Sequence, residues 1–118
     1  MNNIIFEITL APDEHNFGVD LKLHIYQPGD KKLPHGPRVK LYKPKQSARN
    51  FEVSLNVDPR KIKLVAGSYR NLIKDSEFYS LLSKIKKYRI PLLNAWNDQK
   101  INSKDVISQM KLIDNLNS

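Results

Sequence analysis

Residues 20–26 read DLKLHIY, and residues 38–43 read RVKLYK. In both stretches apolar and polar residues alternate, which is the period of a β-strand with one buried face. We expect the apolar positions to face a core: Leu21, Leu23, Ile25, Val39 and Leu41. If the two strands pair, their polar positions share the opposite face: Lys22, His24, Tyr26, Arg38, Lys40 and Tyr42. This pair of strands therefore predicts both a fold and a candidate surface.

The same period recurs on both sides of this pair. Ile4, Phe6, Ile8 and Leu10 alternate with polar or exposed positions, and Phe51, Val53, Leu55 and Val57 do so further along. Residues 62–65 (IKLV) suit a short fifth strand. Short strands separated by Pro and Gly turns favour an antiparallel meander.

After residue 75 the period changes to that of helices. Phe78, Leu81, Leu82 and Ile85 form an i, i+3, i+4, i+7 stripe, and Asp75 or Ser76 is the expected N-cap. Pro91 predicts a second helix with the proline in its first turn. A last helix begins with Asn102 or Ser103 as its cap.

These patterns predict one α+β domain over residues 1–118. Residues 3–66 form an antiparallel sheet of four or five strands, and residues 76–114 form two or three helices on one of its faces. The expected core is Ile4, Phe6, Ile8, Leu21, Leu23, Ile25, Val39, Leu41, Phe51, Val53, Leu55, Phe78, Leu81, Leu82, Ile85, Leu93, Trp96 and Ile107.

The charge is unevenly distributed along the chain. Residues 1–20 hold four acids and no Lys or Arg, whereas residues 21–70 hold twelve bases and three acids. The whole chain carries a formal net charge of +8. Such a positive surface attracts phosphate backbones or acidic proteins.

Composition excludes several classes of function. The chain has no cysteine, which rules out disulfides, thiolate zinc sites and a thiol nucleophile. Its N-terminal sequence lacks the basic region of a signal peptide and has an acid, Glu7, inside its short apolar run, and no apolar run is long enough to span a membrane. We expect a cytoplasmic protein without a membrane partner. Its oligomeric state is not predicted.

The basic sheet face is the candidate binding surface. Cations next to aromatic rings can hold phosphates and stack exposed bases. We expect RNA, in preference to DNA, as the partner, with an acidic protein as the alternative. The expected binding residues are Lys22, Tyr26, Lys31, Lys32, Arg38, Lys40, Tyr42, Lys43, Lys45 and Arg49.

Catalysis is a further alternative, which we rank below binding. A metal-independent ribonuclease needs a general base, a general acid and a cation on the phosphate. His35 or His24, Tyr42, and Arg38 with Lys40 could supply them. The spacing of His15, His24 and His35 matches no compact zinc site, so we expect neither a metal nor another cofactor.

Two short motifs carry a resemblance to a family. The turn His35-Gly-Pro-Arg-Val39 runs into a strand, and Leu92-Leu-Asn-Ala-Trp-Asn97 ends a late helix. Over residues 35–98 the chain resembles uncharacterised domains of bacterial toxin–antitoxin-like gene pairs. That family usually has a second histidine in the strand, where this chain has Arg38 and Lys40. The resemblance implies a small module of a bacterial accessory or mobile-element system.

Overall fold

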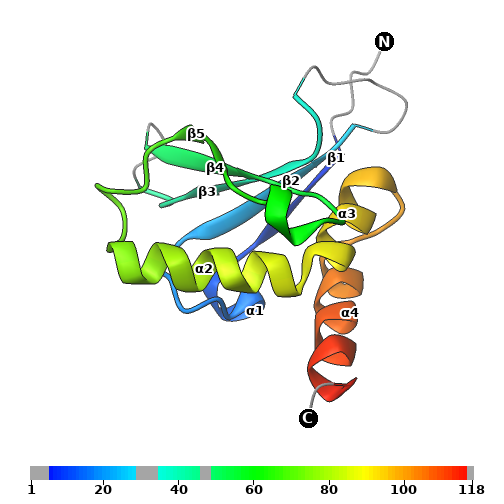
Figure 1. The fold of residues 1–118 in the computed structure, drawn as a ribbon. Helices are drawn as coiled ribbons and strands as arrows, with labels where there is room; N and C mark the ends of the chain where they lie inside the picture. Colours follow the sequence, from blue (N-terminus) through cyan, green and yellow to red (C-terminus); the bar gives the residue numbers. More distant parts are fainter. Residues whose placement is uncertain (1–5, 29–34, 46–48, 117–118) are drawn as a thin grey trace.

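The computed structural model describes residues 6–28, 35–45 and 49–116. It shows the predicted α+β domain: a five-stranded antiparallel sheet from the N-terminal half, followed by three helices (Figure 1). The strands are neighbours in chain order, as in a meander. They are β1 (Phe6–Leu10), β2 (Lys22–Gln27), β3 (Arg38–Tyr42), β4 (Asn50–Ser54) and β5 (Leu64–Gly67).

The helices lie on one side of this sheet (Figure 1). They are α2 (Asp75–Lys87), α3 (Arg89–Asn97) and α4 (Ser103–Leu116), and a one-turn helix, α1 (Pro12–His15), stands where only a turn was expected. Phe78 of α2 packs against Phe51 of β4, with ring centroids 5.9 Å apart. None of the described helices is long and apolar enough to cross a membrane.

The core agrees with the predicted list at most positions. Fourteen of its members are buried: Ile8, Leu21, Leu23, Ile25, Val39, Leu41, Phe51, Val53, Leu55, Phe78, Leu81, Ile85, Leu93 and Trp96. Leu82 and Ile107 are partly buried against it. Ile4 lies outside the described residues. Burying each large side chain contributes about 1.5–3 kcal/mol, so this core can hold the domain together without disulfides.

Phe6 was wrongly placed in that core, because its side chain is 42% exposed. It begins the edge strand β1 and lies opposite Gln27. The buried position there belongs to Gln27, whose amide donates hydrogen bonds to the carbonyls of Asp98 and Ile101 at 3.0 and 2.8 Å. A polar side chain thus anchors the loop between α3 and α4 to the sheet.

The N-cap of α2 was also predicted wrongly. The cap is Lys74, whose N–H donates to Glu77 Oε1 at 2.9 Å. Asp75 instead accepts a hydrogen bond from the hydroxyl of Tyr69 at 2.9 Å. For α4 the cap is Asn102, as expected: Asn102 Oδ1 accepts from the N–H of Asp105, and Asp105 Oδ2 accepts from the N–H of Asn102.

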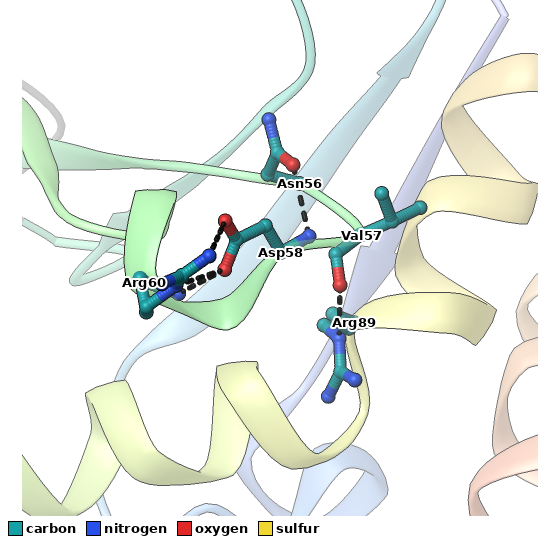
Figure 2. A network of polar contacts seen from close by, with 5 residues as sticks. All are labelled: Asn56, Val57, Asp58, Arg60 and Arg89. Atoms are coloured by element: carbon teal, nitrogen blue, oxygen red, sulfur yellow. Dashed lines mark hydrogen bonds and ion pairs between the residues drawn. The ribbon is translucent and has the colours of Figure 1, made fainter.

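A polar network fixes the connection between β4 and β5 to the helices (Figure 2). Arg89 Nε donates to the carbonyl of Val57 at 2.8 Å, and its Nη1 donates to Lys86 at the end of α2. Asp58 accepts from the backbone N–H of Arg60 and forms an ion pair with its guanidinium at 3.1 Å. The segment that leads into β5 is therefore held in place before the strand begins.

Candidate functional site

The strand register brings the predicted polar residues together on the sheet face away from the helices. In the β2–β3 pair, Lys22 lies opposite Tyr42 and His24 lies opposite Lys40. Neighbouring strands add further polar side chains to this surface. We call it the open face, and it comprises Glu7, Thr9, Lys22, His24, Tyr26, Arg38, Lys40, Tyr42, Asn50, Glu52 and Ser54.

His24 forms the centre of a hydrogen-bonded cluster on the open face. Its Nε2 lies 3.1 Å from Glu7 Oε2, and its Nδ1 lies 3.0 Å from Thr9 Oγ1. A carboxylate can only accept, so Nε2 carries the proton and donates to Glu7. In the neutral ring Nδ1 then accepts from the hydroxyl of Thr9. The edge of the ring meets Tyr26, with centroids 4.8 Å apart.

Burial lowers the pKa of His24, and the charge of Lys40 lowers it further, while Glu7 opposes the shift. The ring is therefore neutral at neutral pH, with both nitrogens occupied. Only 8% of the residue is exposed. A neutral histidine in this state has no free lone pair with which to take a proton from a substrate.

Arg38 is fixed on the same face by two contacts. Its Nη1 lies 3.5 Å from Glu52 Oε2, and its Nη2 donates to the carbonyl of His35 at 3.0 Å. Its Nε is buried and has no hydrogen-bond partner among the described residues. A donor left in that state costs about 1–3 kcal/mol, so an acceptor that reached it would stabilise this surface.

His35 lies at the turn before β3 and is exposed. It joins the site through its backbone, since its carbonyl holds Arg38. Gly36 has a φ of +65°, which explains the glycine at this turn. The structure thus places His24, Arg38, Lys40 and Tyr42 on one face, and His35 at the end of that face.

The open face is less uniformly basic than the sequence analysis predicted. Glu7 and Glu52 face the same way as the cations and pair with His24 and Arg38. Lys22 and Lys40 form no ion pair within the described part of the chain. The further cations Lys43, Lys45 and Arg49 lie where β3 ends and β4 begins. Lys31 and Lys32 lie outside the described residues.

Sequence reasoning missed the two glutamates because it followed only the basic stretch. Glu52 alternates with Phe51 and Val53, so its place on the open face was readable from the same period. The contact between Glu7 and His24 was not readable, since it depends on the register of β1 against β2. The burial of His24 depends on the same register, because Glu7 and Thr9 of β1 both contact its ring.

The motif of residues 92–97 has a structural explanation. Leu92, Leu93, Ala95 and Trp96 are all buried, and Asn94 and Asn97 are exposed. This pattern is that of a helix packed on two sides. The Trp96 motif therefore belongs to the core and not to a ligand site.

A crevice of about 230 Å³ lies on the helical side, where α1, α2 and α4 meet. Lys87 forms an ion pair with Asp114 at 2.9 Å, and the hydroxyl of Tyr88 donates to the same carboxylate. These contacts lower the pKa of Asp114, with the Tyr88 hydroxyl as the larger cause. The contacts among Lys87, Tyr88 and Asp114 connect α4 to the end of α2.

In the described residues no three His, Asp or Glu side chains lie close enough together to form a metal site.

Comparison of the chain with protein-family models, with curated proteins and with solved structures gave no match. The function must therefore be inferred from the geometry of the open face.

Proposed function

We propose that this chain is a small binding module that engages nucleic acid, single-stranded RNA in preference, through its open face. The observation that carries the proposal is the register of β2 against β3, which sets Lys22 opposite Tyr42 and Lys40 opposite His24. Cross-strand neighbours are about 5 Å apart, so a cation and an aromatic ring can contact adjacent parts of one nucleotide. Proteins that bind single strands combine these two groups.

The ion pair on the face supports this proposal. Glu52 is paired with the guanidinium of Arg38, so its charge is partly neutralised within the protein, and Glu7 accepts a hydrogen bond from the neutral ring of His24. Lys22 and Lys40 are then available for phosphates. Lys43, Lys45 and Arg49 extend the positive charge beyond the end of β3, along the direction that a strand of nucleic acid could follow.

Binding is favoured over catalysis by the state of His24. The proposed ribonuclease would need an accessible base, and the ring nitrogens of His24 are both hydrogen-bonded. His35 is exposed at the end of the face, and its contact with Arg38 is made by its backbone carbonyl. We therefore assign the face to recognition. The resemblance of residues 35–39 and 92–97 supports a place in a cytoplasmic, toxin–antitoxin-like system of bacteria.

The test is a fluorescence-anisotropy titration of the protein with labelled single-stranded RNA of mixed sequence at low salt. The variant Lys22→Gln/Lys40→Gln should bind more weakly, and its log–log salt slope should be less steep by about 0.7 for each lost phosphate contact. The matched control is Lys104→Gln/Lys111→Gln on α4, which removes the same charge from the helical side. It should bind like the parent.

Two outcomes contradict the proposal. The first is that neither RNA nor DNA binds at low salt, while an acidic protein does. The second is that the two double variants lose affinity equally, since the effect would then come from net charge and not from the open face.

A further inference from the structure

We propose that the outer edge of β5 is a second binding surface, which takes an acidic, extended peptide segment of another protein by adding it as a strand to the sheet. This surface, the β5 edge, is the side of Leu64–Gly67 that faces away from β4. The proposal is independent of nucleic-acid binding by the open face.

The first observation is that the β5 edge is unpaired and apolar. β5 is the last strand in the sheet order, so no other described strand pairs with its outer side (Figure 1). Leu64 is 36% exposed and Val65 is 38% exposed. An exposed strand of this kind presents backbone N–H and C=O groups that can pair with an incoming strand.

The second observation is the charge around this edge. Residues 59–74 contain five bases and no acid. Lys61, Lys63 and Arg70 are exposed and form no ion pair within the described residues.

The two acids that flank residues 59–74 in the sequence, Asp58 and Asp75, each have another hydrogen-bonding partner. Asp58 is bound to Arg60, and Asp75 accepts from the hydroxyl of Tyr69 (Figure 2 shows the first pair). Glu52 lies opposite Ala66 of β5, but its carboxylate lies beside Arg38. Charge complementarity therefore calls for an acidic partner at the β5 edge.

The third observation is that the segment leading into the β5 edge is hydrogen-bonded to the end of β4. The hydroxyl of Ser54 donates to the carbonyl of Lys61 at 2.7 Å and accepts from the N–H of Lys63 at 3.0 Å. The N–H of Ser54 donates to the carbonyl of Lys63 at 2.9 Å. Because the start of the edge is fixed in this way, it loses less conformational entropy when a strand is added, which favours binding.

The edge at the other side of the sheet does not suit the same partner. β1 carries Glu7, and the segment that follows it holds Asp13, Glu14 and Asp20. Addition of β1 from a second copy to the β5 edge would be a head-to-tail contact, which builds a ring or an open fibre instead of a two-fold dimer. We therefore commit to a different protein as the partner.

The experiment uses the full chain, labelled with ¹⁵N, and an eight-residue peptide of alternating Glu and Val. A control peptide of the same net charge has two central Val residues replaced by Pro, which cannot donate backbone hydrogen bonds. The expected result is that the first peptide shifts the amide resonances of residues 63–68 and protects amides of β5 from exchange. The proline peptide should bind at least about tenfold more weakly.

A matched pair of variants tests the charge. Lys63→Glu/Arg70→Glu should weaken binding of the Glu-Val peptide by at least about tenfold. Lys104→Glu/Lys111→Glu should leave it unchanged. Circular dichroism of both variants checks that they fold. If a variant does not fold, the peptide-induced shifts measured on the parent protein still test the proposal.

Four outcomes overturn the proposal: the shifts map outside β5, the proline peptide binds equally well, both charge variants behave alike, or single-stranded RNA shifts the same β5 amides more strongly. Concentration-dependent light scattering of the protein alone, accompanied by shifts in β5, would also overturn it in favour of self-association.

Discussion

The ring of His24 and the carboxylate of Glu7 meet across the β1–β2 pair, with Nε2 and Oε2 3.1 Å apart on the open face. Glu7 opposes the lowering of the pKa of His24 by burial. Removing its charge should therefore lower that pKa further. In Glu7→Gln, an NMR titration of the histidine ring protons should show the midpoint of His24 at lower pH than in the parent. Glu52→Gln is the control, because Glu52 pairs with Arg38. An unchanged or higher midpoint in Glu7→Gln would contradict the contact.

His15 predicts a loss of stability in mild acid. Its Nε2 donates to the carbonyl of Leu21 at 2.7 Å, and its Nδ1 accepts from the N–H of Phe17 at 3.0 Å. Burial lowers the pKa of His15 below its ordinary 6.5 despite the Leu21 carbonyl. The folded state therefore disfavours protonation of the His15 ring. The contribution of the neutral ring to the free energy of unfolding is fully present above pH 6.5 and is lost as the pH falls from there toward the folded pKa.

Urea denaturation between pH 8 and pH 5 measures that loss. The free energy of unfolding should fall over this range, and the decrease should be smaller in His15→Gln, which has no titrating ring. His24→Gln should also show a smaller decrease, since the pKa of His24 is lowered as well. A flat profile in the parent, or a decrease in each variant as large as in the parent, would show that these rings are not held neutral.

Gly67 should be the least replaceable glycine among those described. Its φ is +73°, and a Cβ there would lie 2.3 Å from the carbonyl oxygen of Asn50 on β4. Gly67→Ala should lower the free energy of unfolding by about 2 kcal/mol or more, since both backbone strain and a steric clash oppose it. Gly18→Ala is the matched control: φ is +79°, but nothing lies within 4 Å, so about 1 kcal/mol is expected. If thermal or urea unfolding shows the same loss of free energy of unfolding in both variants, β5 accommodates the added methyl group without a steric clash.

Gln27 should contribute more to stability than its neighbour Gln99. Truncation in Gln27→Ala removes the side-chain donor from the carbonyl of Ile101 and one of two donors from the carbonyl of Asp98, which also accepts from the N–H of Ile101, and should cost about 1–3 kcal/mol. Gln99 is exposed, and its side chain donates one hydrogen bond within the described residues, to the carbonyl of Gln27 at 2.9 Å. Gln99→Ala should therefore change the free energy of unfolding by less than about 0.5 kcal/mol. If the two variants unfold alike, the α3–α4 loop is not anchored through Gln27.

The sequence could predict which residues share a face, because alternation decides the side of a strand. It predicted the meander, the paired face of Lys22 and Tyr42, and the helical stripe of Phe78. It could not predict how deeply each side chain is buried. Phe6 has the right parity for the core but stands at the start of an edge strand, and His24 has the parity of a surface residue but is buried by Glu7, Thr9 and Tyr26.

The role of Gln27 was missed because its side chain hydrogen-bonds a loop more than 70 residues away in the sequence. The cap of α2 was missed for a local reason. The propensity for Asp or Ser as an N-cap was followed, whereas the N–H of Lys74 donates to Glu77 three residues later and Asp75 accepts from the hydroxyl of Tyr69.

The central claim, that the open face contacts nucleic acid, is tested most directly by the ring resonances of its two tyrosines. In protein with ¹³C-labelled tyrosine, single-stranded RNA at low salt should shift the ring signals of Tyr26 and Tyr42, which lie among Lys22, His24 and Lys40. Tyr79 on α2 is 64% exposed and serves as the internal control, and its signals should stay in place. Shifts of Tyr79 without shifts of Tyr26 and Tyr42, or no shift at all with saturating RNA, would contradict the account.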